Sequence, residues 1–199
     1  MREGIRTVIG NKKIKHNSAI VVGNGPSAKI NPLNCVRDLF VIRVNFYFME
    51  KERTWGDDVS LHIMSTYRRL LWDGIHVNER NGPYNVNQYA FSKESEINSR
   101  LKEFDSSSFK SITNYKWFDH FDLFRSDQRV RDIFVERCLG ALPTTGISAL
   151  AVAALHGFEK IYYIGIDLYN VHGARHAFDY PDFQKNNIAL RHLEGGYES

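Results

Sequence analysis

Four short polar clusters follow apolar runs in this sequence, and together they could bind a nucleotide. The first is Gly-Asn-Gly-Pro-Ser at residues 23–27, and the second, residues 43–45, ends at Asn45. The third is Thr-Thr-Gly at residues 144–146, and the fourth holds Asp167. Glycines let backbone N–H groups approach a ligand, asparagine can hydrogen-bond a sugar or a base, and a helix starting at the third cluster would offer its positive end to a phosphate. The joint pattern favours a nucleotide site.

Each cluster taken alone has a plainer interpretation. Residues 23–27 lack the third glycine of the dinucleotide fingerprint and the lysine of a P-loop, so a plain turn explains them equally well. Asn45 alone would be a strand-end cap, and Asp167 alone is as consistent with a helix cap as with a ligand contact. The nucleotide interpretation therefore depends on all four clusters lying at one edge of a sheet.

Buried strands and a helix must bring these clusters together. An Ala/Leu-rich stretch at residues 147–156 predicts a helix, with Thr145 as its N-cap and Gly157 just after its end. It leads into the apolar run 160–167, which predicts a central parallel strand and half of a βαβ unit. In an open parallel sheet, ligands bind outside the carboxyl ends of the strands. Other apolar runs predict strands at residues 19–22, 39–44 and 59–64.

Length and composition bound the fold and exclude several classes of protein. At ~150 residues per domain, a chain of 199 residues predicts one domain. Apolar residues make up 43% and charged residues 25%, which is the composition of a globular protein and not of a disordered or coiled-coil chain. The 26 basic and 23 acidic side chains give a net charge of +3, which is too small to indicate a nucleic-acid partner but leaves anionic small substrates open.

Cysteine and histidine spacing indicates neither a disulfide framework nor a metal site. Cys35 and Cys138 lie far apart and form no CxxC pair, which fits a reducing compartment. His172 and His176 are spaced i, i+4, but Gly173 between them argues against the helix that a shared metal ion would need. We therefore expect no resident metal. We also expect no other cofactor.

Three segments are predicted along the chain. Residues 1–18 form a basic N-terminal arm, which we interpret as solvated, with a weak contact to anionic lipid as the alternative. Residues 19–180 form the α/β domain, and residues 181–199 form a lid or a truncated C-terminal segment. The longest apolar run, residues 147–155, is far short of the ~20 residues that span a bilayer, so no membrane span is expected.

Five blocks, taken in order, resemble the bacterial lipooligosaccharide sialyltransferases of glycosyltransferase family 42. They are residues 21–27, 43–48, 144–146 with the helix that follows, 164–169 and 177–179. The resemblance implies a single Rossmann-like α/β domain, with a mostly parallel central sheet flanked by helices and a flexible lid after the last block. It also implies inverting, metal-independent transfer of sialic acid from CMP-sialic acid to a galactose or sialic acid of a surface glycan, and assembly into tetramers.

Carried over position by position, the resemblance assigns donor-binding roles. Asn24 and Asn45 would hold the cytidine monophosphate, and Asp167 would read the ribose or the cytosine. Ser65 stands where the family has a further nucleotide-contacting asparagine, and donor binding should survive this change. Leu142 stands where the family has an arginine, so the acceptor preference would differ. The other expected positions of the substrate site are Gly23, Gly25, Ser27, Thr144, Thr145, Gly146 and Gly165.

The implied reaction must stabilise a departing phosphate and deprotonate an acceptor hydroxyl. Tyr169 matches one phosphate-bonding tyrosine of the family, and His176 replaces a second one, where its N–H could still donate; a surface-loop role is the alternative. His192 is the best match for the family's base, at a shorter interval after Asp179, unless the base lies in residues absent from this chain. His62, on an apolar run, is interpreted as a satisfied core group.

Two other functions stay open on the sequence. One is that of the motility-associated glycosyltransferase-like proteins, which share a Gly-Asn-Gly-Pro-Ser loop and transfer nonulosonic acids to flagellin. The other is a CMP-binding paralogue without catalysis. For the leading hypothesis the expected partners are CMP-sialic acid and a glycan acceptor, with no nucleic acid. The expected location is the cytoplasm, with peripheral contact at the cytoplasmic face of the inner membrane.

Overall fold

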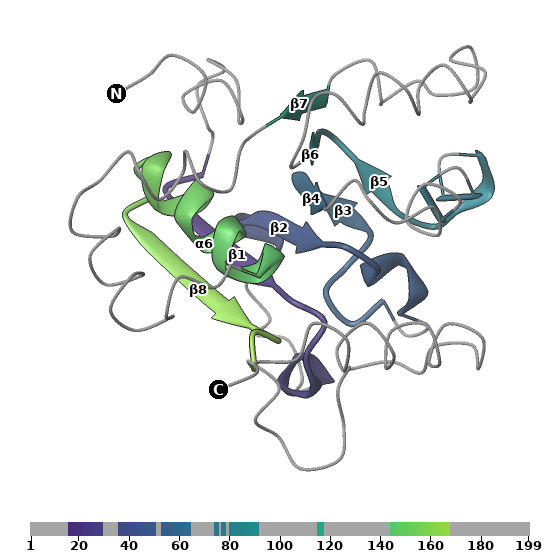
Figure 1. Cartoon of the computed structure of the whole chain (residues 1–199), viewed down its shortest axis with the longest axis horizontal. Coiled ribbons are helices and arrows are strands. Elements are labelled where there is room, and N and C mark those ends of the chain that lie inside the picture. Colours follow the sequence, from purple (N-terminus) through teal and green to yellow (C-terminus); the bar gives the residue numbers. More distant parts are fainter. Residues whose placement is uncertain are drawn as a thin grey trace, which may run out of the picture.

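Parallel strands form the centre of the protein. The computed structural model describes residues 16–29, 36–50, 53–64, 74–75, 77–78, 80–91, 115–117 and 144–167. Its larger sheet consists of β1 (Ser18–Val22), β2 (Phe40–Val44), β4 (Leu61–Met64), β6 (Tyr89–Phe91), β7 (Tyr115–Trp117) and β8 (Lys160–Ile164). In the order β7-β6-β4-β2-β1-β8, every neighbouring pair is parallel (Figure 1). The predicted α/β fold with a mostly parallel sheet is therefore confirmed.

Helix α6 (Thr145–Leu155) lies over β1 and β2 and also contacts β8 (Figure 1). Its N-cap is Thr144 and not the predicted Thr145, because the hydroxyl of Thr144 accepts from the Ile147 N–H at 3.4 Å. The prediction was one residue late since either threonine has the right side chain to cap a helix. Gly157 follows the helix with a φ of 77°, as its predicted place after the helix end requires.

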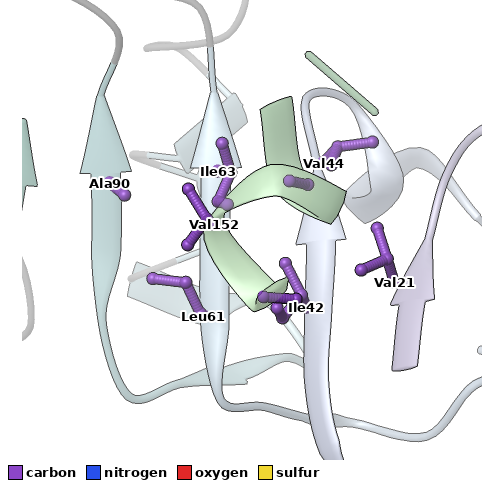
Figure 2. Close-up of a cluster of buried hydrophobic side chains, with 9 residues drawn as sticks. Val21, Ile42, Val44, Leu61, Ile63, Ala90 and Val152 are labelled. Carbon is purple, nitrogen blue, oxygen red and sulfur yellow. The ribbon is translucent and has the colours of Figure 1, made fainter. Parts of the chain in front are cut away.

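The core forms where α6 meets the sheet. Small residues of the helix, Ala149 and Ala153, let it approach the strands closely, and Val152 packs among their aliphatic side chains (Figure 2). A second cluster, which includes Ile20 and Val22 of β1, packs on the opposite face of the sheet. Both faces of β1 are buried, as its uninterrupted apolar run predicts for a parallel strand. The strand residues of the first cluster are Val21, Ile42, Val44, Leu61, Ile63 and Ala90.

The strand predicted at residues 59–64 is divided in two. Its first part is β3 (Asp58–Val59), which pairs with β5 (Asn85–Val86) in a separate two-stranded sheet, and its second part is β4. Ser60 lies at the break, where its hydroxyl accepts from the Val41 N–H at 3.1 Å. A side-chain oxygen therefore takes the place of a backbone acceptor beside β2, which a pattern of apolar residues does not reveal.

Strand β8 is the last strand of the sheet in the part of the chain that the structure describes. Within the described part of the chain it pairs only with β1, and its Tyr162 and Tyr163 are 42% and 65% exposed. A central position for this strand stays a prediction, because its pairing is known only within the described ranges. The strand also ends at Ile164, earlier than predicted, since Gly165 turns the chain with a φ of 72°.

Three short 3-10 helices of the described residues flank β1 and β2. They are η1 (Pro26–Lys29), which follows β1, η2 (Val36–Asp38), which precedes β2, and η3 (Tyr47–Met49), which follows β2.

None of the helices in the described ranges has both the length and the apolar character that crossing a bilayer requires. The predicted arm at residues 1–18 and the predicted segment 181–199 fall mostly or wholly outside the described residues, so the division of the chain stays a prediction.

Candidate functional site at the carboxyl edge of the sheet

The predicted clusters meet at one edge of the sheet. Because β1 lies between β2 and β8 and all three are parallel, the segments that follow them leave the sheet side by side. The start of α6 joins them, since a Cβ built on Gly146 would lie 3.3 Å from Ile166 Cγ1, just after β8. The structure therefore brings together residues 23–27, Asn45, residues 144–146 and Asp167, which is the arrangement that the nucleotide interpretation needs.

Glycines join the loop after β1 to the end of β8. The N–H groups of Gly23 and Gly25 donate to the carbonyls of Ile164 and Gly165, each at 2.8 Å. A Cβ at Gly23 would collide with the Gly165 carbonyl, and a Cβ at Gly165 would lie 2.5 Å from the Gly23 oxygen. The two backbones are therefore in contact, and no larger residue fits at either position. We call the contact between residues 23–27 and 165–167 the glycine clasp.

Asp167 completes the glycine clasp through Ser27. One carboxylate oxygen accepts from the Ser27 N–H at 2.8 Å, and the other accepts from the Ser27 hydroxyl at 2.5 Å. The Gly165 N–H donates to the same hydroxyl at 2.8 Å. Each carboxylate oxygen has a further lone pair, so the contact between Asp167 and a ribose or cytosine stays a prediction. The geometry gives Asp167 a structural task that the sequence did not indicate, across 140 positions of the chain.

Asn24 connects the loop after β1 to the end of β2. Its Nδ2 donates to the Val44 carbonyl at 3.0 Å. Its Oδ1 is buried and has no hydrogen-bond partner among the residues that the structure describes. A buried acceptor without a donor is costly, so a ligand hydroxyl or amine that donated to this oxygen would be favoured.

Asn45 directly follows β2 in a left-handed conformation, with a φ of 48°. Non-glycine residues seldom adopt this conformation, although asparagine tolerates it better than most. Both backbone groups of Asn45 are bonded to β4: its N–H donates to the Ile63 carbonyl at 3.0 Å, and its carbonyl accepts from His62 Nε2 at 2.9 Å. The position of this asparagine is therefore set by the neighbouring strand.

Arg43 lies in β2 and is buried, so it belongs to the core behind the edge and not to the polar cluster in which the sequence places it. It is 2% exposed and pairs with Glu50, and its guanidinium carbon lies 4.9 Å from the ring centroid of Tyr47. Tyr84 donates its hydroxyl to the Glu50 carbonyl at 3.3 Å, and burial, followed by the charge of Glu50, raises the pKa of Tyr84 to about 12. A charged residue within an apolar run was the signal that a buried partner had to exist.

Thr144 and the first turn of α6 also lie at the carboxyl edge, next to Ile166. The Thr144 carbonyl accepts from Ser148 and its hydroxyl caps the helix, so the remaining N–H groups of the first turn carry the positive end of the helix dipole. The first turn contains no acidic residue. An anionic group placed here would be stabilised.

Four of the predicted site residues lie outside the described residues. They are Ser65, Tyr169, His176 and His192. Their roles in donor binding, phosphate stabilisation and proton transfer stay predictions. Within the described residues, no group of three or more His, Cys, Asp or Glu side chains is close enough to hold a metal ion.

A parallel sheet whose carboxyl edge carries a glycine turn, two asparagines and a helix N-terminus defines a Rossmann-like protein with a candidate nucleotide site. A family model, described as Alpha-2,3-sialyltransferase (CST-I), matches residues 17–196. The chain therefore belongs to this sialyltransferase family and is a glycosyltransferase, which confirms the family resemblance of the sequence. No curated protein matches the chain.

Solved sialyltransferase structures from Campylobacter jejuni share the fold. CstII in complex with the substrate analogue cytidine-5'-monophosphate is 24% identical, covering 91% of this chain and 77% of that one, with a TM-score of 0.58. Monofunctional alpha-2,3-sialyltransferase Cst-I is 18% identical, covering 92% and 74%, with a TM-score of 0.64. CST-II in complex with a trisaccharide acceptor and CMP is 22% identical, covering 91% and 78%, with a TM-score of 0.56. At these identities the likeness is one of fold.

Proposed function

We propose that this protein transfers sialic acid from CMP-sialic acid to a galactose or sialic acid of a bacterial surface glycan, with inversion and without a metal ion. The observation that carries the proposal is the convergence of Asn24, Asn45 and the start of α6 at one edge of the sheet, in a chain of the sialyltransferase family. CMP in the CstII complexes and the trisaccharide acceptor in one of them support the donor and acceptor classes.

The donor would bind across the carboxyl edge. Its phosphate would lie near the start of α6, where the helix dipole favours an anion. The nucleoside would lie along Asn24 and Asn45, whose amides can bond a ribose or a base. Asp167, already bonded to Ser27, would hold the glycine clasp in shape and could accept one further bond from the nucleoside.

The chemical step needs charge stabilisation at the departing phosphate. CMP-sialic acid carries its phosphate on the anomeric carbon, so breaking that bond leaves negative charge on the phosphate and an oxocarbenium-like sugar. Tyr169 and His176 are the proposed donors to the phosphate, because an O–H and an N–H bond more strongly as the charge grows. Tyr169→Phe should therefore slow transfer much more than it weakens donor binding.

His192 is the proposed base that takes the proton of the acceptor hydroxyl. A neutral imidazole suits this task near neutral pH. Inversion follows if the acceptor attacks from the side opposite the phosphate in a single displacement. A homo-oligomer and a cytoplasmic location, at the cytoplasmic face of the inner membrane, belong to the same proposal because the family resemblance implies them.

One assay tests the proposal. Labelled CMP-sialic acid is incubated with the 199-residue chain and either a lactoside or a sialyl-lactoside, with and without EDTA. We expect transfer to one of them, unchanged by EDTA and abolished by His192→Ala, whereas His16→Ala, at the opposite end of β1, has no effect. Activity lost to EDTA and restored by Mg²⁺ contradicts the metal-free mechanism, and donor binding without transfer or hydrolysis indicates a non-catalytic protein.

A further inference from the structure

His62 is a buried histidine whose ring is bonded to the candidate site. It lies in β4, opposite Arg43 of β2 and Tyr89 of β6, and it is 1% exposed. Its Nε2 lies 2.9 Å from the carbonyl oxygen of Asn45. A carbonyl oxygen can only accept, so Nε2 must be the protonated nitrogen of the ring. His62 is therefore not an ordinary core residue, because it holds the residue that follows β2.

The other ring nitrogen of His62, Nδ1, makes no bond within the described part of the chain that would explain a histidine at this position. Burial lowers the pKa of His62 to about 3, with a smaller contribution from the charge of Arg43, so the ring is neutral and Nδ1 carries no hydrogen. Nδ1 is buried and has no hydrogen-bond partner among the described residues. Leaving one nitrogen unbonded costs stability, and an apolar side chain in its place would avoid that cost. A histidine here is therefore explained by what its Nε2 does for Asn45.

Aromatic side chains fix the direction of the imidazole ring. The ring centroid of Tyr47 lies 4.8 Å from that of His62, with the two rings almost perpendicular at 87°. Tyr89 lies at 5.4 Å and Phe48 at 6.4 Å. These contacts hold the ring so that Nε2 points at one carbonyl, which a longer and more flexible side chain would do less well.

We infer that His62 is a positioning residue for the donor nucleotide. Its Nε2–H holds the carbonyl of Asn45 and so fixes the left-handed backbone, which sets where the asparagine side chain stands at the carboxyl edge. The inference rests on the proposed function, in which Asn45 holds CMP. His62 would then affect donor affinity from the interior of the sheet, without touching the donor.

Two substitutions separate this role from a merely structural one. His62→Gln keeps an N–H donor near the position of Nε2, whereas His62→Leu fills the space and removes the donor. A core role predicts that leucine is tolerated as well as glutamine or better. The positioning role predicts that glutamine preserves CMP affinity and that leucine does not.

The experiment is a calorimetric titration with CMP, after each variant is shown to be folded by circular dichroism and urea unfolding. We expect His62→Leu to weaken CMP binding about fivefold, as the loss of one neutral hydrogen bond implies, and His62→Gln to stay within about twofold of wild type. In an Asn45→Ala background, His62→Leu should have no further effect, because there is no amide left to position. The matched control is His156→Leu, since His156 also has a buried Nε2 without a described partner but lies at the far end of α6.

Several results would overturn the inference. These are unchanged affinity in His62→Leu while Asn45→Ala loses affinity, equal losses in His62→Leu and His62→Gln, or losses that add in the double variant. If His62→Leu does not fold, nitrogen NMR of the wild-type imidazole decides, since a hydrogen on Nδ1 in place of Nε2 contradicts the bond to Asn45. Wild-type protein that binds no CMP overturns the proposed function itself, which is a separate and recognisable outcome.

Discussion

The two sides of the carboxyl edge are held together in different ways. On the β1 and β8 side, the glycine clasp brings two backbones into contact and closes with the bonds between Ser27 and Asp167. On the β2 and β4 side, buried side chains make the connecting bonds: His62 is bonded to Asn45, and Arg43 is paired with Glu50. One side therefore depends on the absence of side chains, and the other depends on their chemistry.

This difference shows in what each side tolerates. Backbone contact leaves no room to adjust, so any added carbon atom on the clasp side must push two strands apart. On the other side, buried polar bonds join Arg43 to Glu50 and His62 to Asn45, so a change of chemistry without a change of size is enough to disturb it. Steric substitutions should therefore disrupt the first side, and isosteric ones the second.

The largest expected effect is that of Gly23→Ala. The new methyl group would collide with the Gly165 carbonyl and separate β1 from β8, so we expect a loss of about 4 kcal/mol in the free energy of unfolding. Gly157→Ala is the control: its φ is also positive, at 77°, but no atom lies within 4 Å of the added carbon, so the loss should be about 1 kcal/mol. Urea unfolding measures both, and equal losses would show that the clasp is not sterically tight.

Glu50→Gln should have the next largest effect. The substitution keeps the size of the side chain but leaves the buried charge of Arg43 without its counterion, at a cost of about 3 kcal/mol in the free energy of unfolding. The matched control is Asp57→Asn, which removes the acid of the exposed pair with Arg53 and should cost less than about 0.5 kcal/mol. A loss as small as that of the control would show that the pair of Arg43 and Glu50 does not stabilise the β2 and β4 side.

Acid should weaken the β2 and β4 side through His62. Burial holds the pKa of His62 near 3 in the folded protein, against 6.5 for an ordinary histidine, so between these values the unfolded chain binds a proton that the folded chain does not. The stabilisation is complete above pH 6.5 and is lost as the pH falls toward 3, which at pH 5 amounts to about 2 kcal/mol. Urea unfolding at pH 7.5 and pH 5 should show this loss, and His62→Gln should reduce it.

Burial also lowers the pKa of His156, to about 4, so some loss in acid should persist in the His62→Gln variant. An identical dependence on pH in the wild type and in His62→Gln would mean that His62 is not the buried neutral group described here.

The sequence predicts the strands and the helix better than the bonds that join them. Runs of β-branched residues are enough to predict β1 and β2, and the Ala-rich stretch ending at Gly157 predicts α6, because these are local signals. The glycines of residues 23–27 mark a close approach, although not what approaches. Local patterns do not contain the bond between His62 and Asn45, or that between Ser27 and Asp167, because each depends on the register of strands distant in the sequence.

One error of prediction has the same origin. The division of the strand at Ser60 follows from which strand lies beside which, and a pattern of apolar residues does not record that. Arg43 shows what a sequence can reveal: a charge within an apolar run indicates a buried partner but does not identify Glu50.

Calorimetric titration of CMP against the wild type and Asn45→Ala tests the central claim, that the carboxyl edge holds the donor nucleotide, most directly. Removing the Asn45 amide leaves a polar group of the bound nucleoside without its partner, which costs about 1–3 kcal/mol, so Asn45→Ala should weaken CMP binding by about tenfold. Asn17→Ala is the control, because Asn17 is exposed and lies just before β1, at the opposite edge of the sheet. The account predicts wild-type affinity for Asn17→Ala and a clear loss for Asn45→Ala, and equal affinity in all three proteins would contradict it.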